Sequence, residues 1–143
     1  MRLASSGSRR LGVGRVNVLL DTSAYSALRR GNQLILDVLR RSETVVMSAV
    51  VLGELYSGFR SGNRWKENTA QLSQFLSKPS VRIANITEET AMRYAEVDVY
   101  LREKGRPIPR NAVWIAAGAL EHGCQLLTLD VHFREIPLLL IQP

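Results

Sequence analysis

Five short apolar runs punctuate the chain, and each has the length of a strand. Most of them lack strict alternation of apolar and polar residues, which is typical of strands buried on both faces of a sheet. These runs cover residues 16–20, 44–47, 81–86, 125–129 and 137–141.

Between the apolar runs, hydrophobic residues recur at the three- and four-residue spacing of amphipathic helices. Helices are predicted over residues 22–28, 33–41, 49–60, 65–77, 88–104 and 112–122. In the second of these, Leu34 and Val38 share a face. In the third, the stripe is formed by Leu52, Leu55, Tyr56 and Phe59. Glu54 lies outside that stripe, so packing does not explain it.

The predicted helices have recognisable starts and stops. Residues whose side chains can cap a helix N-terminus precede four of them: Asp21, Ser48, Thr87 and Asn111. Gly105 and Gly123 are placed to end helices. Pro107 and Pro109 exclude regular helix from the segment between Gly105 and Asn111.

Strands that alternate with helices predict right-handed βαβ crossovers. We therefore expect an α/β fold, a three-layer α/β/α domain with a central, mainly parallel sheet. A length of 143 residues fits one such domain.

Composition changes this picture mainly at the N-terminus. Residues 1–15 carry four arginines and no acid, and we interpret them as a flexible basic arm, or as a remnant of cloning or of an upstream start, before a domain at 16–143. Without the arm, the formal net charge of +6 falls to +2, with 15 basic and 13 acidic residues. The charge of the domain is therefore a weak indication of nucleic-acid binding.

Several classes of protein are disfavoured. A single cysteine, Cys124, excludes an intrachain disulfide, and we expect it to be a packed apolar residue rather than a nucleophile. Two distant histidines, His122 and His132, argue against a histidine-based zinc site. No apolar run has the length of a membrane span. The composition suits a reducing cytoplasm, which is the expected location.

Two carboxylates follow predicted strands directly. Asp21 ends the first strand and Asp130 the fourth, so both should point beyond the carboxyl edge of the sheet, where open α/β folds bind ligands. Glu54 lies on the predicted helix at 49–60. Clustered carboxylates favour a hard divalent cation such as Mg²⁺ or Mn²⁺, which activates water for phosphodiester hydrolysis. The hydroxyls of Thr22, Ser23 and Thr128 are available to orient a phosphate or a metal-bound water.

Each acid also has a simpler explanation. Asp21 can be only a helix cap, Glu54 a solvated residue on a polar helix face, and Asp130 a turn former.

Four sequence segments, in their order along the chain, favour a metal site over these simpler explanations. VNVLLDTSAYSAL, SAVVLGELYSGF, PIPRNAVWIAAGALEHG and LLTLDVHF resemble the PIN-domain ribonucleases, particularly VapC-type toxins of bacterial toxin–antitoxin pairs. The resemblance runs from residue 16 to the C-terminus and implies a PIN-like fold. It further implies a Mg²⁺- or Mn²⁺-dependent endoribonuclease that cuts structured RNA such as tRNA or rRNA. A homodimer and inhibition by a VapB-type antitoxin are implied too.

The resemblance also assigns residues. It implies that Asp21, Glu54 and Asp130 are metal-binding acids, with four neighbours around the site: Thr22, Ser23, Asn111 and Thr128. Glu96 and Asp98 are candidate outer acids.

One position departs from the family pattern. The family has an aspartate after the asparagine that opens the sixth helix, and this chain has Ala112. We therefore hypothesise an inactive or impaired enzyme, arising from either an engineered or a natural replacement.

Two other functions compete with this hypothesis. A non-catalytic PIN module would hold RNA or antitoxin without cutting. An aspartyl phosphotransferase would use Asp21, but it expects a second aspartate at position 23, which is serine.

Overall fold

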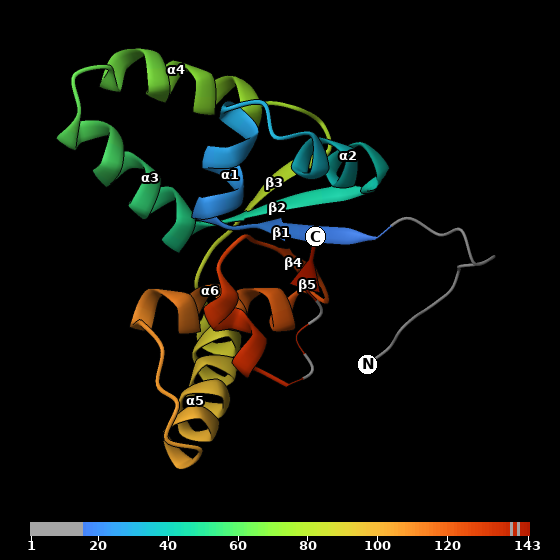
Figure 1. Cartoon of the computed structure of the whole chain (residues 1–143), viewed down its shortest axis with the longest axis vertical. Helices are drawn as coiled ribbons and strands as arrows, with labels where there is room; N and C mark the ends of the chain where they lie inside the picture. Colours follow the sequence, from blue (N-terminus) through green and yellow to red (C-terminus); the bar gives the residue numbers. More distant parts are fainter. Residues whose placement is uncertain (1–15, 138, 140) are drawn as a thin grey trace.

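A five-stranded parallel sheet runs through the middle of the protein (Figure 1). The structure is a computed structural model that describes residues 16–137, 139 and 141–143. The strand order is β3-β2-β1-β4-β5. The strands are β1 (Asn17–Leu20), β2 (Thr44–Ser48), β3 (Val81–Ala84), β4 (Gln125–Leu127) and β5 (Ile141–Gln142). The predicted basic arm at 1–15 lies outside the described residues.

Helices cover both faces of the sheet, which confirms the three-layer α/β/α fold. They are α1 (Thr22–Arg29), α2 (Gln33–Arg41), α3 (Ala49–Ser61), α4 (Trp65–Leu76), α5 (Glu88–Glu103) and α6 (Arg110–Glu121), with a 3-10 helix, η2 (Val131–Glu135). Helices α1 to α4 lie on one side of the sheet and α5 and α6 on the other (Figure 1). Among the described residues, none of the helices combines the length and the apolar character needed to cross a bilayer. The cytoplasmic location stays a prediction.

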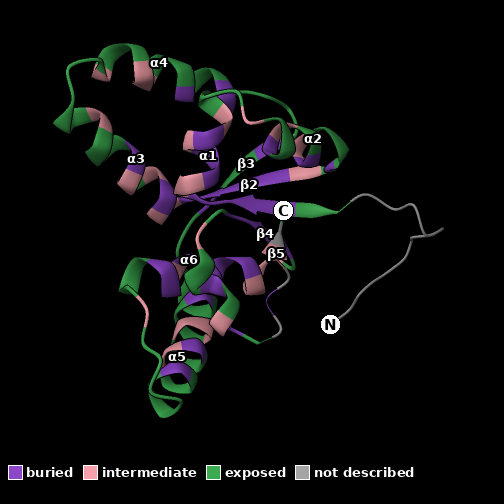
Figure 2. Cartoon of the chain, in the orientation of Figure 1, coloured by how far each residue is buried: buried purple, intermediate pink, exposed green. Residues whose placement is uncertain are grey.

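The core lies between these layers. Val18, Leu19 and Leu20 of the central strand β1 have no exposed surface, as expected for a strand covered on both faces. The buried residues follow the strands and the inner sides of the helices (Figure 2). Strand β3 differs, because it is at the sheet edge: Arg82 and Ile83 in its middle are exposed.

In two helices, one residue of the predicted apolar face is exposed. In α2 the buried residues are Ile35 and Val38, whereas Leu34 is 65% exposed. In α3 the predicted residues Leu52, Leu55 and Phe59 do pack on the core, and Val51 joins them, but Tyr56 is exposed. Several stripes fit the spacing of an apolar-rich helix, and only packing against the sheet selects one of them.

Most predicted helix boundaries are confirmed by contacts. The side chain of Ser48 accepts a hydrogen bond from the backbone N–H of Val50, and Thr87 forms a capping box with Thr90. Gly105 and Gly123 adopt φ values of 69° and 63°, the left-handed conformation that follows a helix C-terminus.

Two boundary predictions were wrong. Asn111 does not cap α6, which begins at Arg110 after Pro109 and has no side-chain cap. Proline fits this place because its fixed φ suits a helix start. The last strand is Ile141–Gln142 and not 137–141, in which positions 138 and 140 lie outside the described residues.

Candidate functional site

A cleft of about 430 Å³ opens where β1 and β4 end. Its lining comprises Asp21, Thr22, Ser23, Ser26, Glu54, Pro109, Asn111, Ala112, Ile115, Asp130 and Phe133. The three predicted acids therefore share one cleft with position 112. Parallel strands β1 and β4 are neighbours, so the chain segments that follow them meet at the same edge of the sheet.

Asp21 is the most tightly held of the three acids. It is only 3% exposed, and its Oδ1 accepts hydrogen bonds from the backbone N–H of Ala24 at 2.9 Å and from the Ser23 hydroxyl at 2.8 Å. The hydroxyl of Thr128 donates to Oδ2. Burial raises the pKa of Asp21, these hydrogen bonds oppose the rise, and the charge of Asp130 adds to it. Asp21 thus caps α1 and also presents a carboxylate whose charged form needs further stabilisation.

Asp130 is joined to Asp21 through Thr128. The Thr128 hydroxyl accepts a hydrogen bond from the backbone N–H of Asp130 at 2.9 Å while it donates to Asp21. Asp130 also caps η2, since its Oδ1 accepts from the backbone N–H of His132 at 2.9 Å. The same oxygen lies 2.9 Å from Nδ1 of His132. One of the two carboxylate oxygens of Asp130 is therefore committed to protein contacts.

Glu54 reaches the cleft from α3. Its Oε1 accepts a hydrogen bond from the Thr22 hydroxyl, and its Oε2 accepts one from Nδ2 of Asn111 at 3.2 Å. Glu54 therefore ties α1 to the start of α6. Glu54 is half-buried, and both of its carboxylate oxygens have protein partners, which a freely solvated side chain would lack.

Ala112 lies in the first turn of α6 and is 7% exposed. Its methyl group contributes to the wall of the cleft and offers no ligand. The first turn of α6 contains no acidic residue.

The two candidate outer acids lie elsewhere on α5. Glu96 pairs with Arg93, and Asp98 accepts a hydrogen bond from Arg102 at 3.1 Å. Neither is part of the cleft lining. Their role as outer acids stays a prediction.

The cleft contains ligand atoms of the kind that some divalent cations prefer. The cleft offers oxygen ligands only, which suits Mg²⁺ or Mn²⁺. However, among the residues that the structure describes, no group of three His, Cys, Asp or Glu side chains is arranged to hold one ion. Mg²⁺ is commonly held by one or two carboxylates and retains several waters, so Asp21 and Asp130 fit such an ion without a third direct ligand.

Sequence reasoning missed four residues of the lining: Ser26, Pro109, Ile115 and Phe133. Ser26 could have been predicted from the sequence, because it follows Thr22 by one helical turn and so lies on the same face of α1. Nothing in the sequence distinguishes the apolar residues of the lining from the other residues of the core.

Comparisons with known proteins agree with this geometry. The family model of the PIN domain matches residues 18–139. Ribonuclease VapC2 of Rickettsia felis is 29% identical over 108 residues, covering 75% of this chain and 79% of that protein. Ribonuclease VapC5 of Mycobacterium tuberculosis is 28% identical over 118 residues, covering 82% of this chain and 86% of that protein.

Solved structures show the same fold. The VapBC2 complex of Rickettsia felis, bound to a DNA fragment from its promoter, contains a chain that superposes with a TM-score of 0.77 at 26% identity; the match covers 88% of this chain and 97% of that one. VapBC-1 of nontypeable Haemophilus influenzae matches in fold with a TM-score of 0.79 at 24% identity, over 88% of this chain and 96% of that one. With the family model matching most of the chain, this protein belongs to the PIN domain family, and its relatives include VapC ribonucleases.

Proposed function

We propose that this protein is a VapC-type toxin, a metal-dependent endoribonuclease that cuts structured RNA such as tRNA or rRNA. The observation that carries the proposal is the single cleft that contains Asp21, Glu54, Asp130 and position 112 in a PIN domain. The relatives named ribonucleases support the choice of RNA as substrate.

The residues of the cleft have distinct roles in this proposal. Asp21 and Asp130 would hold Mg²⁺ or Mn²⁺, which would activate a water for hydrolysis of the phosphodiester bond. Ser23 and Thr128 orient the carboxylate of Asp21 by donating to its two oxygens. Thr22 and Asn111 hold Glu54 over the cleft, where its carboxylate can orient a water.

Ala112 leads us to propose that the chain as it stands is inactive or impaired. The methyl group cannot bind an ion or a water at a place where the family has an aspartate. Loss of correct positioning by about 1 Å can cost on the order of 100-fold in rate. The surrounding contacts of Glu54, Asn111 and Asp21 are intact, so the defect is confined to one side chain.

Restoring the acid tests this proposal. Total RNA is incubated with the chain and with its Ala112→Asp variant, each folded and free of antitoxin, in Mn²⁺ and in EDTA. We expect cleavage by the variant alone, and only in Mn²⁺. Cleavage by neither protein contradicts the nuclease assignment. Equal cleavage by both shows that position 112 is dispensable.

A non-catalytic RNA- or antitoxin-binding module is the second candidate, and Ala112 is the observation that favours it. It predicts a complex with RNA that persists in Mn²⁺ without cleavage, even after the Ala112→Asp change.

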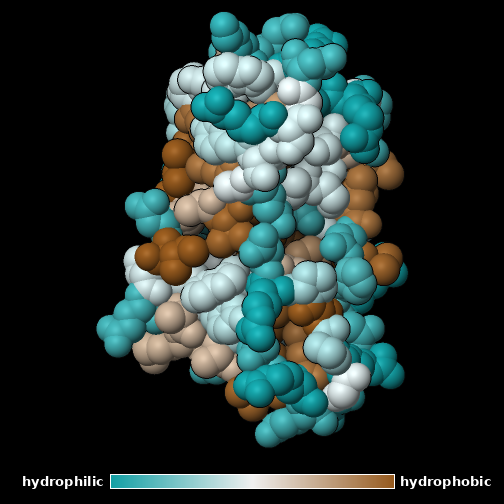
Figure 3. Space-filling view, turned by 90° about the vertical axis from the view of Figure 1, so that its left-hand side faces the viewer, coloured by the Kyte–Doolittle hydropathy of each residue, from teal (hydrophilic) through white to brown (hydrophobic). Residues whose placement is uncertain are grey.

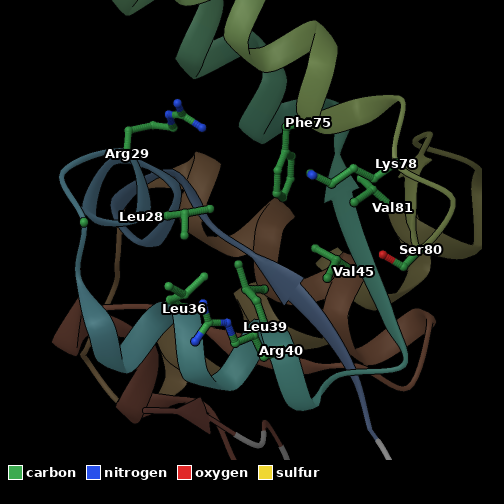
Figure 4. Close-up of a pocket in the computed structure, with 11 residues that line it drawn as sticks. Leu28, Arg29, Leu36, Leu39, Arg40, Val45, Phe75, Lys78, Ser80 and Val81 are labelled. Atoms are coloured by element: carbon green, nitrogen blue, oxygen red, sulfur yellow. The ribbon is translucent and has the colours of Figure 1, made fainter.

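We further propose a VapB-type antitoxin as partner, since the solved relatives are VapBC complexes. A groove of about 420 Å³ between α1, α2 and α4 suits such a segment (Figure 4). Leu28, Leu39 and Phe75 form part of its apolar wall. Three cationic residues, Arg29, Arg40 and Lys78, also line the groove. A partner segment with apolar side chains flanked by acids matches this combination.

The groove proposal is tested with an antitoxin co-expressed from the same operon. Arg40→Glu reverses one charge of the groove and should weaken co-purification, whereas Arg102→Glu on α5 should not. Equal co-purification of both variants contradicts this binding site.

A homodimer also stays a proposal, supported by apolar surface. Met92 and Val99 are 56% and 43% exposed and lie seven residues apart, on one face of α5. Ile83 and Ile86 are exposed on the edge strand and just after it. Apolar patches also gather in the middle of the face that Figure 3 shows. Light scattering coupled to size exclusion should give twice the chain mass of 16.0 kDa, and a monomer at micromolar concentration contradicts the proposal.

A further inference from the structure

A second hollow adjoins the acidic cleft, on the other side of Ser26. It has a volume of about 170 Å³. Its lining consists of Tyr25, Ser26, Arg29, Phe59, Asn68 and Gln71. Ser26 lines both this hollow and the cleft. The two spaces are therefore neighbours along α1.

Several polar side chains around this hollow form no hydrogen bond within the described part of the protein. In the part of the chain that the structure describes, the side chains of Ser26, Asn68 and Gln71 form no hydrogen bond with protein groups. Ser26 and Asn68 are half-buried and Gln71 is exposed. Tyr25 is only 2% exposed as a whole residue, and its hydroxyl, which keeps some contact with solvent, forms no hydrogen bond with the described residues either. These polar groups are reached by solvent, so water satisfies them in the free protein and they are available to a ligand. A polar ligand can replace that water with direct hydrogen bonds.

The spacing along α1 relates the hollow to the acids. Thr22, which holds Glu54, lies one turn before Ser26, and Arg29 follows three residues later. These residues share one face of the helix, and Ser26 is displaced from Thr22 by about 6 Å along the axis. The hollow therefore begins about one nucleotide away from the acidic cleft.

The lining combines groups that recognise a base. Asn68 and Gln71, three residues apart on one face of α4, offer two side-chain amides. An amide can read N6 and N7 of adenine with two hydrogen bonds. Phe59 offers an aromatic ring, on which unpaired bases of RNA commonly stack. Arg29 supplies a charge for a neighbouring phosphate.

We propose that this hollow, the base subsite, receives an unpaired base of the RNA, adenine foremost, next to the phosphodiester bond at the acidic cleft. The proposal rests on the proposed ribonuclease function and adds a source of sequence preference to it. The volume is well below the roughly 300–1,000 Å³ of pockets for whole ligands, so it fits one ring system and not a complete nucleotide.

Binding can be measured without cleavage. Four fluorescent RNA hairpins that differ only in three unpaired loop bases (all A, C, G or U) are titrated in EDTA with the chain and three variants. Asn68→Leu and Gln71→Leu remove the amides of the base subsite. Gln74→Leu, an exposed glutamine on the same helix and outside the lining, is the matched control.

We expect the A-loop hairpin to bind at least about 5-fold more tightly than the U-loop hairpin, the lower end of what one good base contact contributes. Each of Asn68→Leu and Gln71→Leu should reduce that ratio to below about 2-fold with U-loop binding unchanged. Gln74→Leu should preserve the ratio. The inference is overturned if the chain shows no preference or if the two subsite variants keep it. It is equally overturned if they weaken only antitoxin capture, which would assign the hollow to the protein partner.

The same changes in the Ala112→Asp background separate this inference from the proposed function. Cleavage of total RNA with a preference that Asn68→Leu and Gln71→Leu leave intact overturns the base subsite and keeps the nuclease. Base-dependent binding that these variants abolish, without any cleavage, keeps the base subsite and rejects the nuclease. Thermal melts of all variants confirm that each is folded.

Discussion

Replacing Ala112 by aspartate adds a fourth carboxylate to a cleft that already holds three. The new group lies beside Asp21, whose pKa is already raised by burial and by the charge of Asp130. Two carboxylates about 6 Å apart, at an effective dielectric constant near 20, repel each other by about 3 kcal/mol. Glu54 and Asp130 are partly open to solvent, which reduces this figure by screening.

The helix offsets part of the repulsion. Position 112 is in the first turn of α6, which has no acidic residue, and a carboxylate there gains about 0.3–1 kcal/mol from the helix dipole. A metal-free net loss of about 1–2 kcal/mol remains, or a fall in Tm of roughly 3–6 °C for a chain of this size. A bound cation should reverse the sign, since free metal at 100 times its Kd stabilises the fold by about 2.7 kcal/mol.

Thermal melts followed by circular dichroism, in EDTA and across a Mn²⁺ series, measure both effects. The matched control is Ala91→Asp, which places a new acid near the start of α5 and outside the cleft. We expect Mn²⁺ to raise the Tm of Ala112→Asp more than that of the unchanged chain, and to leave the Ala91→Asp difference unaltered. A metal-free Ala112→Asp protein that is more thermostable than this chain would refute the shared acidic cleft.

Three other perturbations test contacts and burial in this fold, two of them at the acidic cleft. The folded pKa of Asp21 is raised above its ordinary value of 3.8, so the free energy of unfolding falls as pH rises from that value through the folded pKa. Asp21→Asn should therefore increase stability at pH 7 in EDTA but not at pH 3, as urea titrations would show; equal gains at both pH values contradict a buried charge. Burial raises the pKa of Cys124 to about 11, and at pH 8 its alkylation by iodoacetamide should be about 100-fold slower than that of a free thiol. Comparable rates would mean that the thiol is accessible. Thr22→Val removes the donor to Glu54 and should cost about 1 kcal/mol in urea unfolding, whereas an unchanged midpoint would show that this contact contributes nothing.

Much of the fold is readable from local sequence. The apolar runs identify β1, β2 and β4 because strands buried on both faces admit few polar residues. The helix starts at Ser48 and Thr87 and the helix ends at Gly105 and Gly123 are equally predictable, because capping depends on the residue itself. The prediction that Asn111 caps α6 was wrong, because an asparagine before an apolar helix resembles a cap even when its side chain has another partner.

Part of the candidate site also follows from sequence. The places of Asp21 and Asp130 at the ends of strands put both at the carboxyl edge of a parallel sheet, and the order of the four segments pointed to the PIN family before any contact was known. The metal, the RNA substrate and the impaired activity remain proposals.

Only the tertiary structure decided how the acids meet. Contacts between residues 32 and 57 positions apart bring Thr22 and Asn111 to Glu54, and local patterns carry no information about such pairs. The raised pKa of Asp21 likewise depends on burial beneath other segments. Local sequence patterns predicted most of the strands and helices and the two acids that follow strands, Asp21 and Asp130. Packing determined which faces became buried and placed Ala112 within the wall of one cleft, because burial and long-range contact depend on segments that are distant in the chain.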